Sequence, residues 1–364
     1  MKLKIKKEAI IDGLQKVQSI VNPRTTLPIL SNILFRAEKD RLWLSATDLE
    51  VSVRASVEAE VLEEGGVTLH ARRAFSIFRE LSAPEIEIES DDNDLAKINT
   101  ASSYFKMVGI SEDDFPPLPK FDEGNSYSLD QDLFRDMLQK TCYAASTDET
   151  RQVLNGVLMS FRNDKLTTVA TDGRRLALVE QEVEFPADSE IDLIVPSKTV
   201  NELVRTLGDS GTVKVVATQK QVAFDFGEML VVSRLIEGTY PNYRQVVPAS
   251  SDQRVPVERE ALLAAVRRAA LMTTDQSRSV KLKFGKNKLE VITETPEVGE
   301  ARETLPIKYA EKEISVAFNP EFLVDPLRNL ESDEIFMEIT DELSPGVIKA
   351  DVPFLYVLMP MRVS

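Results

Sequence analysis

The sequence predicts an α+β fold that is repeated three times along the chain. Three segments contain alternating apolar residues on both sides of a polar turn, which is the pattern of a β-hairpin. Each hairpin lies between two segments whose apolar residues recur every three or four positions, as in an amphipathic helix. The repeat is regular, because matching features of the first two copies, such as Asp48 and Asp172, lie 124 positions apart.

The predicted elements recur in the same order in each copy. The hairpins are expected over residues 31–53, 155–178 and 278–301, with turns at 38–40, 162–164 and 285–287. The helices before them are expected around residues 10–21, 134–141 and 262–270, and the helices after them over 71–81, 196–207 and 319–330. Further strands close each copy, so we expect two helices and about eight strands in each of three domains. The domains are expected over residues 1–122, 123–250 and 251–364.

The sequence of the last predicted helix indicates where the helix begins and where it is expected to kink. Asn319 followed by Pro320 is typical of an N-cap and the first helical position. Pro326 lies inside the same helical pattern. It is expected to kink the helix, because proline lacks the N–H that an interior position donates.

Composition limits the classes of protein to which the chain can belong. It has 364 residues, of which 43% are hydrophobic, so a large core is expected. Cys142 is the only cysteine and His70 the only histidine, which excludes an intrachain disulfide and a multi-histidine metal site. No run approaches the roughly 18 apolar residues of a membrane span, and Glu8 and Asp12 interrupt any signal peptide, so we expect a cytoplasmic protein. The net charge of −16 disfavours general nucleic-acid binding unless positive charges gather on one surface.

No catalytic constellation accompanies the repeated Ala-Thr-Asp sequence. The chain has no G-x-S-x-G, no Walker-type phosphate loop and no G-x-G-x-x-G after a predicted strand. We interpret Asp48 and Asp172 as residues that fix turns through their side chains. The acidic segments 90–94 and 111–115 lack the spacing of a calcium loop and are expected to be solvated. Cys142 is expected to be a packed thiol on a helix, and we predict no enzyme activity, cofactor or metal.

Positive charges recur on the predicted helices. Because they occupy equivalent positions of the copies, internal symmetry is expected to place them on one common face. The basic residues of this face are Lys16, Arg72, Arg73, Arg79, Lys140, Lys198, Arg205, Arg267, Arg268 and Arg328. An acidic protein with such a basic lining can bind DNA. The alternative for each single residue is that it lies on an ordinary solvated helix face.

Six segments of the chain together resemble one known family. They are RTTLPILSNILF (24–35), TDLEVSV (47–53), RQVLNGVL (151–158), TVATDGRRLA (168–177), GTYPNYRQVVP (238–248) and YVLMPMR (356–362). In order and spacing they resemble the DNA polymerase III beta subunit family, the replicative sliding clamps of bacteria. The resemblance implies three clamp-type domains, each with two helices packed on antiparallel sheets, assembling head-to-tail into a six-domain ring of two chains.

The resemblance also implies a function without catalysis. Such a homodimeric ring encircles double-stranded DNA without reading its sequence and acts as a processivity factor in DNA replication. Its implied partners are the replicative DNA polymerase, the clamp loader and other clamp-motif proteins, which bind a peptide pocket. It implies work on the nucleoid, in the cytoplasm, and no membrane partner.

The family positions imply three sets of site residues. The peptide-binding set is Leu154, Thr171, Gly173, Arg174, Arg175, Leu176, Pro241, Val246, Asn319, Phe322, Val357, Met359, Pro360 and Met361. The DNA-facing set is Arg24, Arg72, Arg73, Arg79, Lys140, Lys198, Arg205 and Arg268. The dimer-interface set places Phe105 and Met107 of one chain against Leu271 and Met272 of the other. The chain departs from the family pattern at Gln152, Val153, Arg174 and Gln245.

A size estimate independently favours two chains. Helices are about 10 Å wide, so the six helices of one chain would enclose a circle only about 10 Å clear. This is too narrow for a duplex whose major groove alone is about 12 Å wide, whereas twelve helices leave roughly 28 Å. Two alternatives stay open: a monomeric peptide-binding scaffold that does not encircle DNA, and a hydrolase built on the loop from Asp172 to Arg175.

Overall fold

The structure is a computed structural model that describes residues 1–21, 25–118, 124–186, 189–248 and 254–362. The chain divides into two compact units, which are described separately. Unit 1 comprises Met1–Asp132 and Arg205–Leu235, and unit 2 comprises Leu133–Val204 and Ile236–Ser364. The polypeptide therefore crosses between the units within the second sequence repeat.

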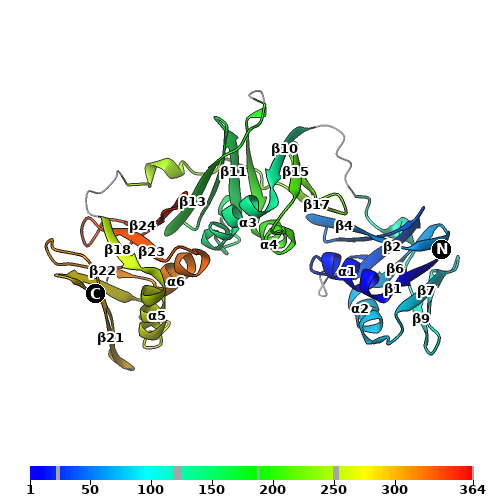
Figure 1. The fold of residues 1–364 in the computed structure, drawn as a ribbon, viewed down its shortest axis with the longest axis horizontal. Coiled ribbons are helices and arrows are strands. Elements are labelled where there is room, and N and C mark those ends of the chain that lie inside the picture. Colours follow the sequence, from blue (N-terminus) through cyan, green and yellow to red (C-terminus); the bar gives the residue numbers. More distant parts are fainter. Residues whose placement is uncertain (22–24, 119–123, 187–188, 249–253, 363–364) are drawn as a thin grey trace. The chain divides into compact units, whose positions relative to one another are not determined.

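The elements follow one order in all three repeats, with one extra strand, β5, in the first (Figure 1). The first repeat contains β1 (Lys2–Lys6), α1 (Lys7–Gln18), β2 (Asn32–Glu38), β3 (Arg41–Thr47), β4 (Val51–Glu58), β5 (Glu60–Glu63), β6 (Gly65–His70), α2 (Ala71–Glu80), β7 (Glu85–Ser90), β8 (Leu95–Asn99) and β9 (Tyr104–Val108). The second contains β10 (Asn125–Asp130), α3 (Gln131–Gln139), β11 (Gly156–Arg162), β12 (Lys165–Thr171), β13 (Arg175–Glu182), β14 (Ile191–Pro196), α4 (Ser197–Thr206), β15 (Thr212–Ala217), β16 (Gln221–Asp225) and β17 (Met229–Arg234). The third contains β18 (Arg254–Glu258), α5 (Arg259–Ala270), β19 (Val280–Gly285), β20 (Lys288–Thr295), β21 (Gly299–Pro306), β22 (Ile314–Phe318), α6 (Pro320–Asn329), β23 (Glu334–Glu338), β24 (Gly346–Lys349) and β25 (Phe354–Leu358).

The three predicted hairpins are confirmed. β2 pairs with β3, β11 with β12 and β19 with β20, each antiparallel and each around the predicted turn. Lys39, Asn163 and Asn287 in these turns have φ of 56°, 54° and 58°. This left-handed conformation matches the twist of the flanking strands, which explains why asparagine recurs there.

The six predicted helices are also confirmed, with one correction. Cys142 lies in a 3-10 turn (Cys142–Ala144) and not on a helix, because α3 ends at Gln139. The hydroxyl of Thr141 donates to the carbonyl of Met137 at 2.8 Å and so satisfies one acceptor at the end of α3. A side chain that bonds the preceding turn in this way competes with continuation of the helix.

The N-terminus of α6 agrees with the sequence prediction. The side-chain oxygen of Asn319 accepts from the backbone N–H of Glu321 at 2.9 Å, and Pro320 occupies the first helical position. Pro326 lies inside α6, which the structure assigns as a single helix on both sides of the proline.

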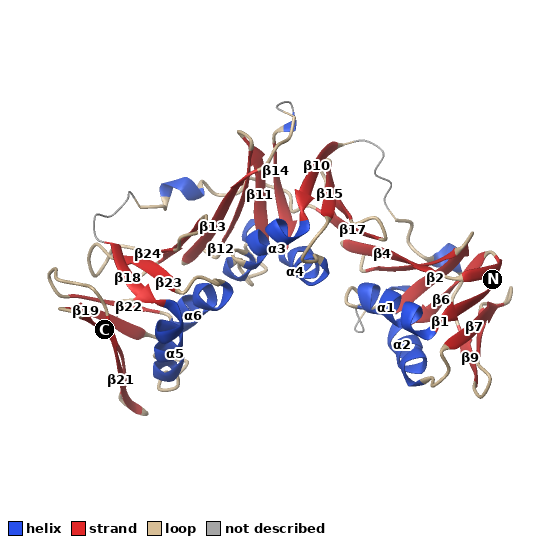
Figure 2. Ribbon diagram, in the orientation of Figure 1, coloured by secondary structure: helices blue, strands red, loops and turns tan. Residues whose placement is uncertain are grey.

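Unit 1 contains two antiparallel sheets. One has five strands in the order β5-β1-β7-β8-β9, and the other has eight in the order β10-β15-β16-β17-β4-β3-β2-β6. The eight-stranded sheet joins the first repeat to the second, because β17 pairs with β4 with Val232 opposite Ser52 (Figure 1). Its inner face is apolar, with Phe35 and Leu44 buried, and α1 packs on β3 and β4 (Figure 2).

Unit 2 repeats this arrangement. Its eight-stranded sheet has the order β14-β11-β12-β13-β25-β24-β23-β18, and its four-stranded sheet has the order β21-β20-β19-β22. β13 pairs with β25, with Ala177 opposite Tyr356, and thereby joins the second repeat to the third. α5 packs on β20 and β21 and lies beside α6 (Figure 2).

Two strands lie at the edges of their sheets, each with one side unpaired. The two joints between repeats pair the third strand of one hairpin meander (β4 or β13) with the last strand of the next repeat (β17 or β25). In the described part of the chain the remaining equivalents, β21 and β9, are edge strands of the four- and five-stranded sheets. β21 is the third strand of its meander and β9 is the last strand of its repeat, so each is of a type that pairs at the two joints.

Candidate functional site

The two Ala-Thr-Asp sequences form the same turn. Asp48 Oδ1 accepts from the backbone N–H groups of Glu50 and Val51 at 3.0 and 2.7 Å. Asp172 Oδ1 accepts from the N–H groups of Arg174 and Arg175 at 2.8 and 3.0 Å. These bonds confirm that both aspartates fix a turn between paired strands.

The turns differ in the residue that takes the left-handed conformation. Gly173 has φ of 85°, and the equivalent residue of the first repeat, Leu49, has φ of 76°. A side chain with a Cβ is strained there, whereas glycine is not. The second turn is thus free of backbone strain and leaves its outer surface open beside Arg174.

Arg175 connects the second repeat to the third. Its guanidinium donates to Asp172 Oδ2 at 3.1 Å, to the carbonyl of Tyr143 at 2.7 Å and to the carboxylate of Asp325 on α6. It also lies 4.4 Å from the ring centroid of Phe322. Burial opposes the charged form, yet the surrounding Tyr356, Asp325 and Asp172 raise the pKa of Arg175 above its ordinary value. We interpret this side chain, only 11% exposed, as one that positions the joint.

Pro326 is accommodated by a bond from outside the helix. A proline at this position removes the N–H that would bond the carbonyl four residues earlier, which belongs to Phe322. The hydroxyl of Tyr356 on β25 donates to that carbonyl at 2.8 Å. Pro326 therefore leaves the Phe322 carbonyl free to accept from Tyr356, and this bond attaches α6 to β25.

An apolar cluster lies over the β13–β25 joint. Its buried members are Leu158, Val169, Leu176, Ile194 and Val357, against which Val153, Leu178, Ile236, Tyr240, Tyr243 and Leu355 pack. The hydroxyl of Tyr240 donates to the carbonyl of Val169 at 3.4 Å, which fixes the segment 238–248 over the sheet. The cluster thus brings together strands of two repeats and a connecting segment, all within unit 2.

The structure divides the predicted peptide-binding set into a floor and a rim. Leu176 and Val357 are 2% and 3% exposed and belong to the cluster. The half-buried members are Leu154, Thr171, Arg175, Asn319, Phe322 and Pro360, and the exposed members are Gly173, Arg174, Pro241, Val246, Met359 and Met361. The N–H of Met359 donates to the carbonyl of Arg174 at 2.9 Å, which brings the end of β25 to the turn. Val246, Met359 and Met361 are 52%, 46% and 39% exposed, so flexible apolar side chains are available to a ligand.

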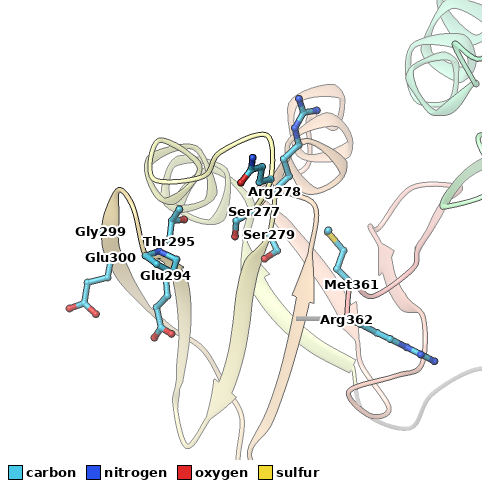
Figure 3. Close-up of a pocket in the computed structure, with 11 residues that line it drawn as sticks. Ser277, Arg278, Ser279, Glu294, Thr295, Gly299, Glu300, Met361 and Arg362 are labelled. Carbon is cyan, nitrogen blue, oxygen red and sulfur yellow. The ribbon is translucent and has the colours of Figure 1, made fainter. Parts of the chain in front are cut away.

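A depression of about 800 Å³ continues past Met361 on the third repeat (Figure 3). It is lined by Ser277 and Arg278 on one side and by Glu294 and Thr295 on another. Figure 3 shows the side chain of Arg362 pointing away from Glu294. Met361 is therefore shared between this depression and the predicted peptide-binding set.

The predicted DNA-facing residues of unit 1 lie on exposed helix surface where they are described. Arg72, Arg73 and Arg79 on α2 are exposed, and so is Arg205 at the end of α4. Arg79 lies 3.3 Å from the carboxylate of its neighbour Glu80 and above the ring of Phe75. Arg24 lies outside the described residues.

Two of the predicted DNA-facing residues of unit 2 differ from the expectation of open cations. Lys140 is 7% exposed and bonds Asp136 at 2.6 Å, because it follows the end of α3 and folds back along it. Arg268 bonds Glu303 on β21 through two nitrogens, at 2.9 and 2.7 Å. Its neighbour Arg267 lines a depression of about 710 Å³ with Arg328. Lys198 is exposed on α4.

The predicted dimer residues comprise two exposed and two largely covered side chains. Leu271 and Phe105 are 79% and 38% exposed, on the turn after α5 and on β9. Met107 is 6% exposed; it lies two positions from Phe105 and so shares that residue's face of the sheet, where it is covered by its own domain. Met272 is half-buried, and its carbonyl accepts from the Thr295 hydroxyl at 2.7 Å. Two further apolar residues of β9, Tyr104 and Val108, are 61% and 79% exposed and were not predicted.

The remaining candidate sites show ordinary structural chemistry. Burial raises the pKa of the Cys142 thiol to about 11, which disfavours the reactive thiolate at neutral pH. Asp91, in the acidic segment 90–94, accepts from the N–H groups of Asn93 and Leu95 and so forms a turn. Among the described residues no three His, Cys, Asp or Glu side chains are grouped as a metal would require. None of the described helices has the length and apolar character needed to cross a membrane.

Three repeats of one helix-and-sheet plan, with sheets that continue across the joints between repeats, define a clamp-type protein. Family models match three consecutive segments: the N-terminal, central and C-terminal domains of the DNA polymerase III beta subunit, over residues 1–119, 128–242 and 244–362. The chain belongs to the DNA polymerase III beta subunit family.

Curated relatives and solved structures agree with this assignment. The beta sliding clamp of Chlamydia trachomatis serovar D is 34% identical over 362 residues, which cover 100% of this chain and 87% of that protein. The beta sliding clamp of Bacillus subtilis strain 168 is 29% identical and is covered completely. A crystal structure of the Bacillus subtilis DNA polymerase sliding clamp has a TM-score of 0.95 at 28% identity, with both chains covered completely. A Pseudomonas aeruginosa sliding clamp bound to griselimycin also has a TM-score of 0.95, at 30% identity and with 100% of both chains covered.

Proposed function

We propose that this chain is a sliding clamp in which two copies form a closed ring around duplex DNA. The observation that supports this most directly is the pair of unpaired edge strands, β9 and β21. Strands of these two types pair at both joints inside the chain. If β9 of each copy pairs with β21 of the other, two such joints close a head-to-tail ring of six domains. The domain boundaries are proposed near residues 122 and 250.

Basic helix residues supply the proposed contact with DNA. Lysine and arginine neutralise phosphates without reading bases, so such contacts are weak, salt-sensitive and compatible with sliding. The contacts are assigned to Arg24, Arg72, Arg73, Arg79, Lys198 and Arg205. In the third repeat Arg267 suits this role better than Arg268, whose charge Glu303 already neutralises. Lys140 contributes less than expected, because it is buried and paired with Asp136.

The apolar cluster over the β13–β25 joint is the proposed tether. Its ligands are short peptide segments of the replicative polymerase, the clamp loader and other clamp-binding proteins. An apolar side chain of the peptide would rest on Leu176 and Val357, while Met359 and Met361 adapt to its shape. In this function the protein performs no reaction and needs no cofactor, and it acts on the nucleoid in the cytoplasm.

Enclosure is tested by the fate of the protein on circular and linear DNA. After loading by a clamp loader, the protein should stay on nicked circular DNA and be lost when the same DNA is linearised. The salt dependence of retention on the circle should be weak, because topology and not phosphate contact prevents escape. Equal loss from both DNA forms would contradict enclosure and favour the monomeric scaffold, for which light scattering would give the mass of a single chain.

The tether is tested by replacing Met359 and Met361 together with alanine. The double variant should bind a fluorescent peptide from the tail of the replicative polymerase about tenfold more weakly, since two exposed apolar side chains are lost. Leu62→Ala is the control, because Leu62 is similarly exposed, at 47%, and lies on β5. Equal peptide affinity of both variants in an anisotropy titration would remove these methionines from the site.

A further inference from the structure

The first repeat has a groove at the position that corresponds to the apolar cluster of the second. In the second repeat one row across three paired strands consists of Leu158, Val169 and Leu178. The row 124 positions earlier, across β2, β3 and β4, consists of Leu34, Ser45 and Arg54. A groove of about 570 Å³ lies over this row, within unit 1. The fold therefore repeats the position of the site but replaces an apolar lining with a charged one, in which Arg36 and Arg54 lie among Glu38, Glu112 and Asp113.

Arg54 lines this groove without an ion pair to another described residue. Its guanidinium carbon lies 4.6 Å above the ring centroid of Trp43, which also lines the groove. Its Nε atom is buried and has no hydrogen-bond partner among the described residues. A buried charged donor of this kind costs free energy unless a ligand satisfies it. The group that fits a planar guanidinium best is a carboxylate.

Glu112 supplies a second unsatisfied group. Its Oε2 atom is buried without a hydrogen bond, and Arg36, 3.6 Å away, also bonds Glu38 at 2.6 Å. A Cβ at Gly66 would lie 2.0 Å from this oxygen, so the carboxylate occupies space that only glycine leaves open. This oxygen can accept from a donor such as a peptide N–H.

Besides these two groups and the charged Arg36, Glu38 and Asp113, the groove presents apolar surface. Leu34 lines the strand side, and Pro116, Pro117 and Leu118 line the opposite side. Phe115 fixes that side to the domain, because it is buried at 7% exposure. An extended peptide offers a carboxylate, backbone N–H groups and apolar side chains at this spacing, whereas a simple acid offers only the first.

We infer that this groove is a second peptide-binding site, which takes an extended segment with an aspartate or glutamate next to an aliphatic residue. The acidic side chain binds Arg54, a backbone N–H of the peptide donates to Glu112, and the aliphatic side chain rests on Leu34. The inference does not depend on the tether proposed for the second repeat, because it is built from residues of unit 1 alone.

The sole tryptophan of the chain makes the site directly observable. The probe is the peptide acetyl-Gly-Leu-Asp-Leu-Gly-amide, titrated into the full-length protein while the fluorescence of Trp43 is recorded. We expect a saturable change in fluorescence whose midpoint rises with salt, because the contact is an ion pair. The same peptide with asparagine for aspartate should bind about tenfold more weakly. A signal that is kept in the Met359 and Met361 double variant but weakened in Arg54→Leu belongs to this groove and not to the tether, so the two proposals fail independently.

Two variants complete the test. Arg54→Leu introduces the residue of the second repeat and should weaken the binding of the acidic peptide about tenfold. Lys214→Leu removes an exposed cation from β15 of the same sheet. This variant should bind the acidic peptide as tightly as the wild-type protein does. The inference is overturned if the wild-type protein gives no saturable signal, or if the aspartate and asparagine peptides bind equally. The peptide comparison uses wild-type protein and holds even if Arg54→Leu does not fold.

Discussion

Replacing Arg175 with methionine is expected to lower the free energy of unfolding of unit 2 by about 3 kcal/mol. Methionine retains an apolar stem but leaves Asp172 and Asp325 without their shared cation and the Tyr143 carbonyl without a donor. Removing one member of a buried ion pair is costly because the remaining charge stays desolvated. Urea unfolding, followed by circular dichroism, should show a lower midpoint with an unchanged slope.

Arg174→Met is the matched control for this prediction. The two arginines are adjacent, but the side chain of Arg174 is exposed and the described residues show it in no ion pair. Its replacement should change the free energy of unfolding by less than about 0.5 kcal/mol. Equal destabilisation by both variants would mean that the turn itself, and not the Arg175 network, stabilises the joint.

The same network bears on the alternative of a hydrolase at this loop. A catalytic aspartate needs an oxygen available to substrate, metal or water. Both oxygens of Asp172 already accept from donors of the turn, Oδ1 from two backbone N–H groups and Oδ2 from Arg175. These bonds explain the presence of Asp172 by its role in the turn, and they disfavour the hydrolase alternative.

The elements were predictable from sequence because their causes are local. Alternation with period two identified the strands, and asparagine identified the turns in which Asn163 and Asn287 take positive φ. The cap at Asn319 was readable for the same reason, since one side chain satisfies a nearby N–H. The end of α3 was missed: the apolar spacing continues to Thr141, but the helix ends at Gln139 and the Thr141 hydroxyl bonds the Met137 carbonyl.

The partners of site residues were not predictable, because they come from distant segments. Asp325 contacts Arg175, which lies 150 positions earlier, and no sequence pattern around either residue predicts that they are paired. Tyr240 and Tyr243 pack on the apolar cluster from the segment 238–248, of which the prediction placed only Pro241 and Val246 in the site. The role of Pro326 was equally hidden, since the hydroxyl that replaces its missing bond belongs to Tyr356.

The repeat pattern explains why the acidic partners of single basic residues could not be predicted. Equivalent positions in the repeats share a place in the fold, so their helices could be matched by spacing. Whether a cation is open or neutralised depends on one acidic neighbour, and that neighbour is not repeated. Glu303 bonds Arg268, and Asp136 bonds Lys140, at positions that the repeat pattern does not specify.

Replacing Phe105 and Leu271 together with alanine is expected to dissociate the proposed dimer. Leu271 is 79% exposed and Phe105 38% exposed in the single chain, so both have apolar surface that pairing of β9 with β21 can bury. Loss of this surface should cost about 3 kcal/mol at each of the two interfaces, which for the whole ring corresponds to roughly 10⁴-fold weaker association. Sedimentation velocity from micromolar to nanomolar concentration should show a monomer appearing at much higher concentration than in the wild-type protein.

The controls separate an interface from a general loss of apolar surface. Leu343→Ala removes a leucine that is 72% exposed on a loop and should leave the dimer intact. Met107→Ala should lower the stability of the five-stranded sheet more than it weakens association, because Met107 faces the core of its own domain. If the Phe105 and Leu271 double variant stays fully dimeric at nanomolar concentration, the β9–β21 joint is not the interface. Two head-to-tail copies would then have no sheet edge of the required type left to close the ring, because the other such strands are paired within the chain.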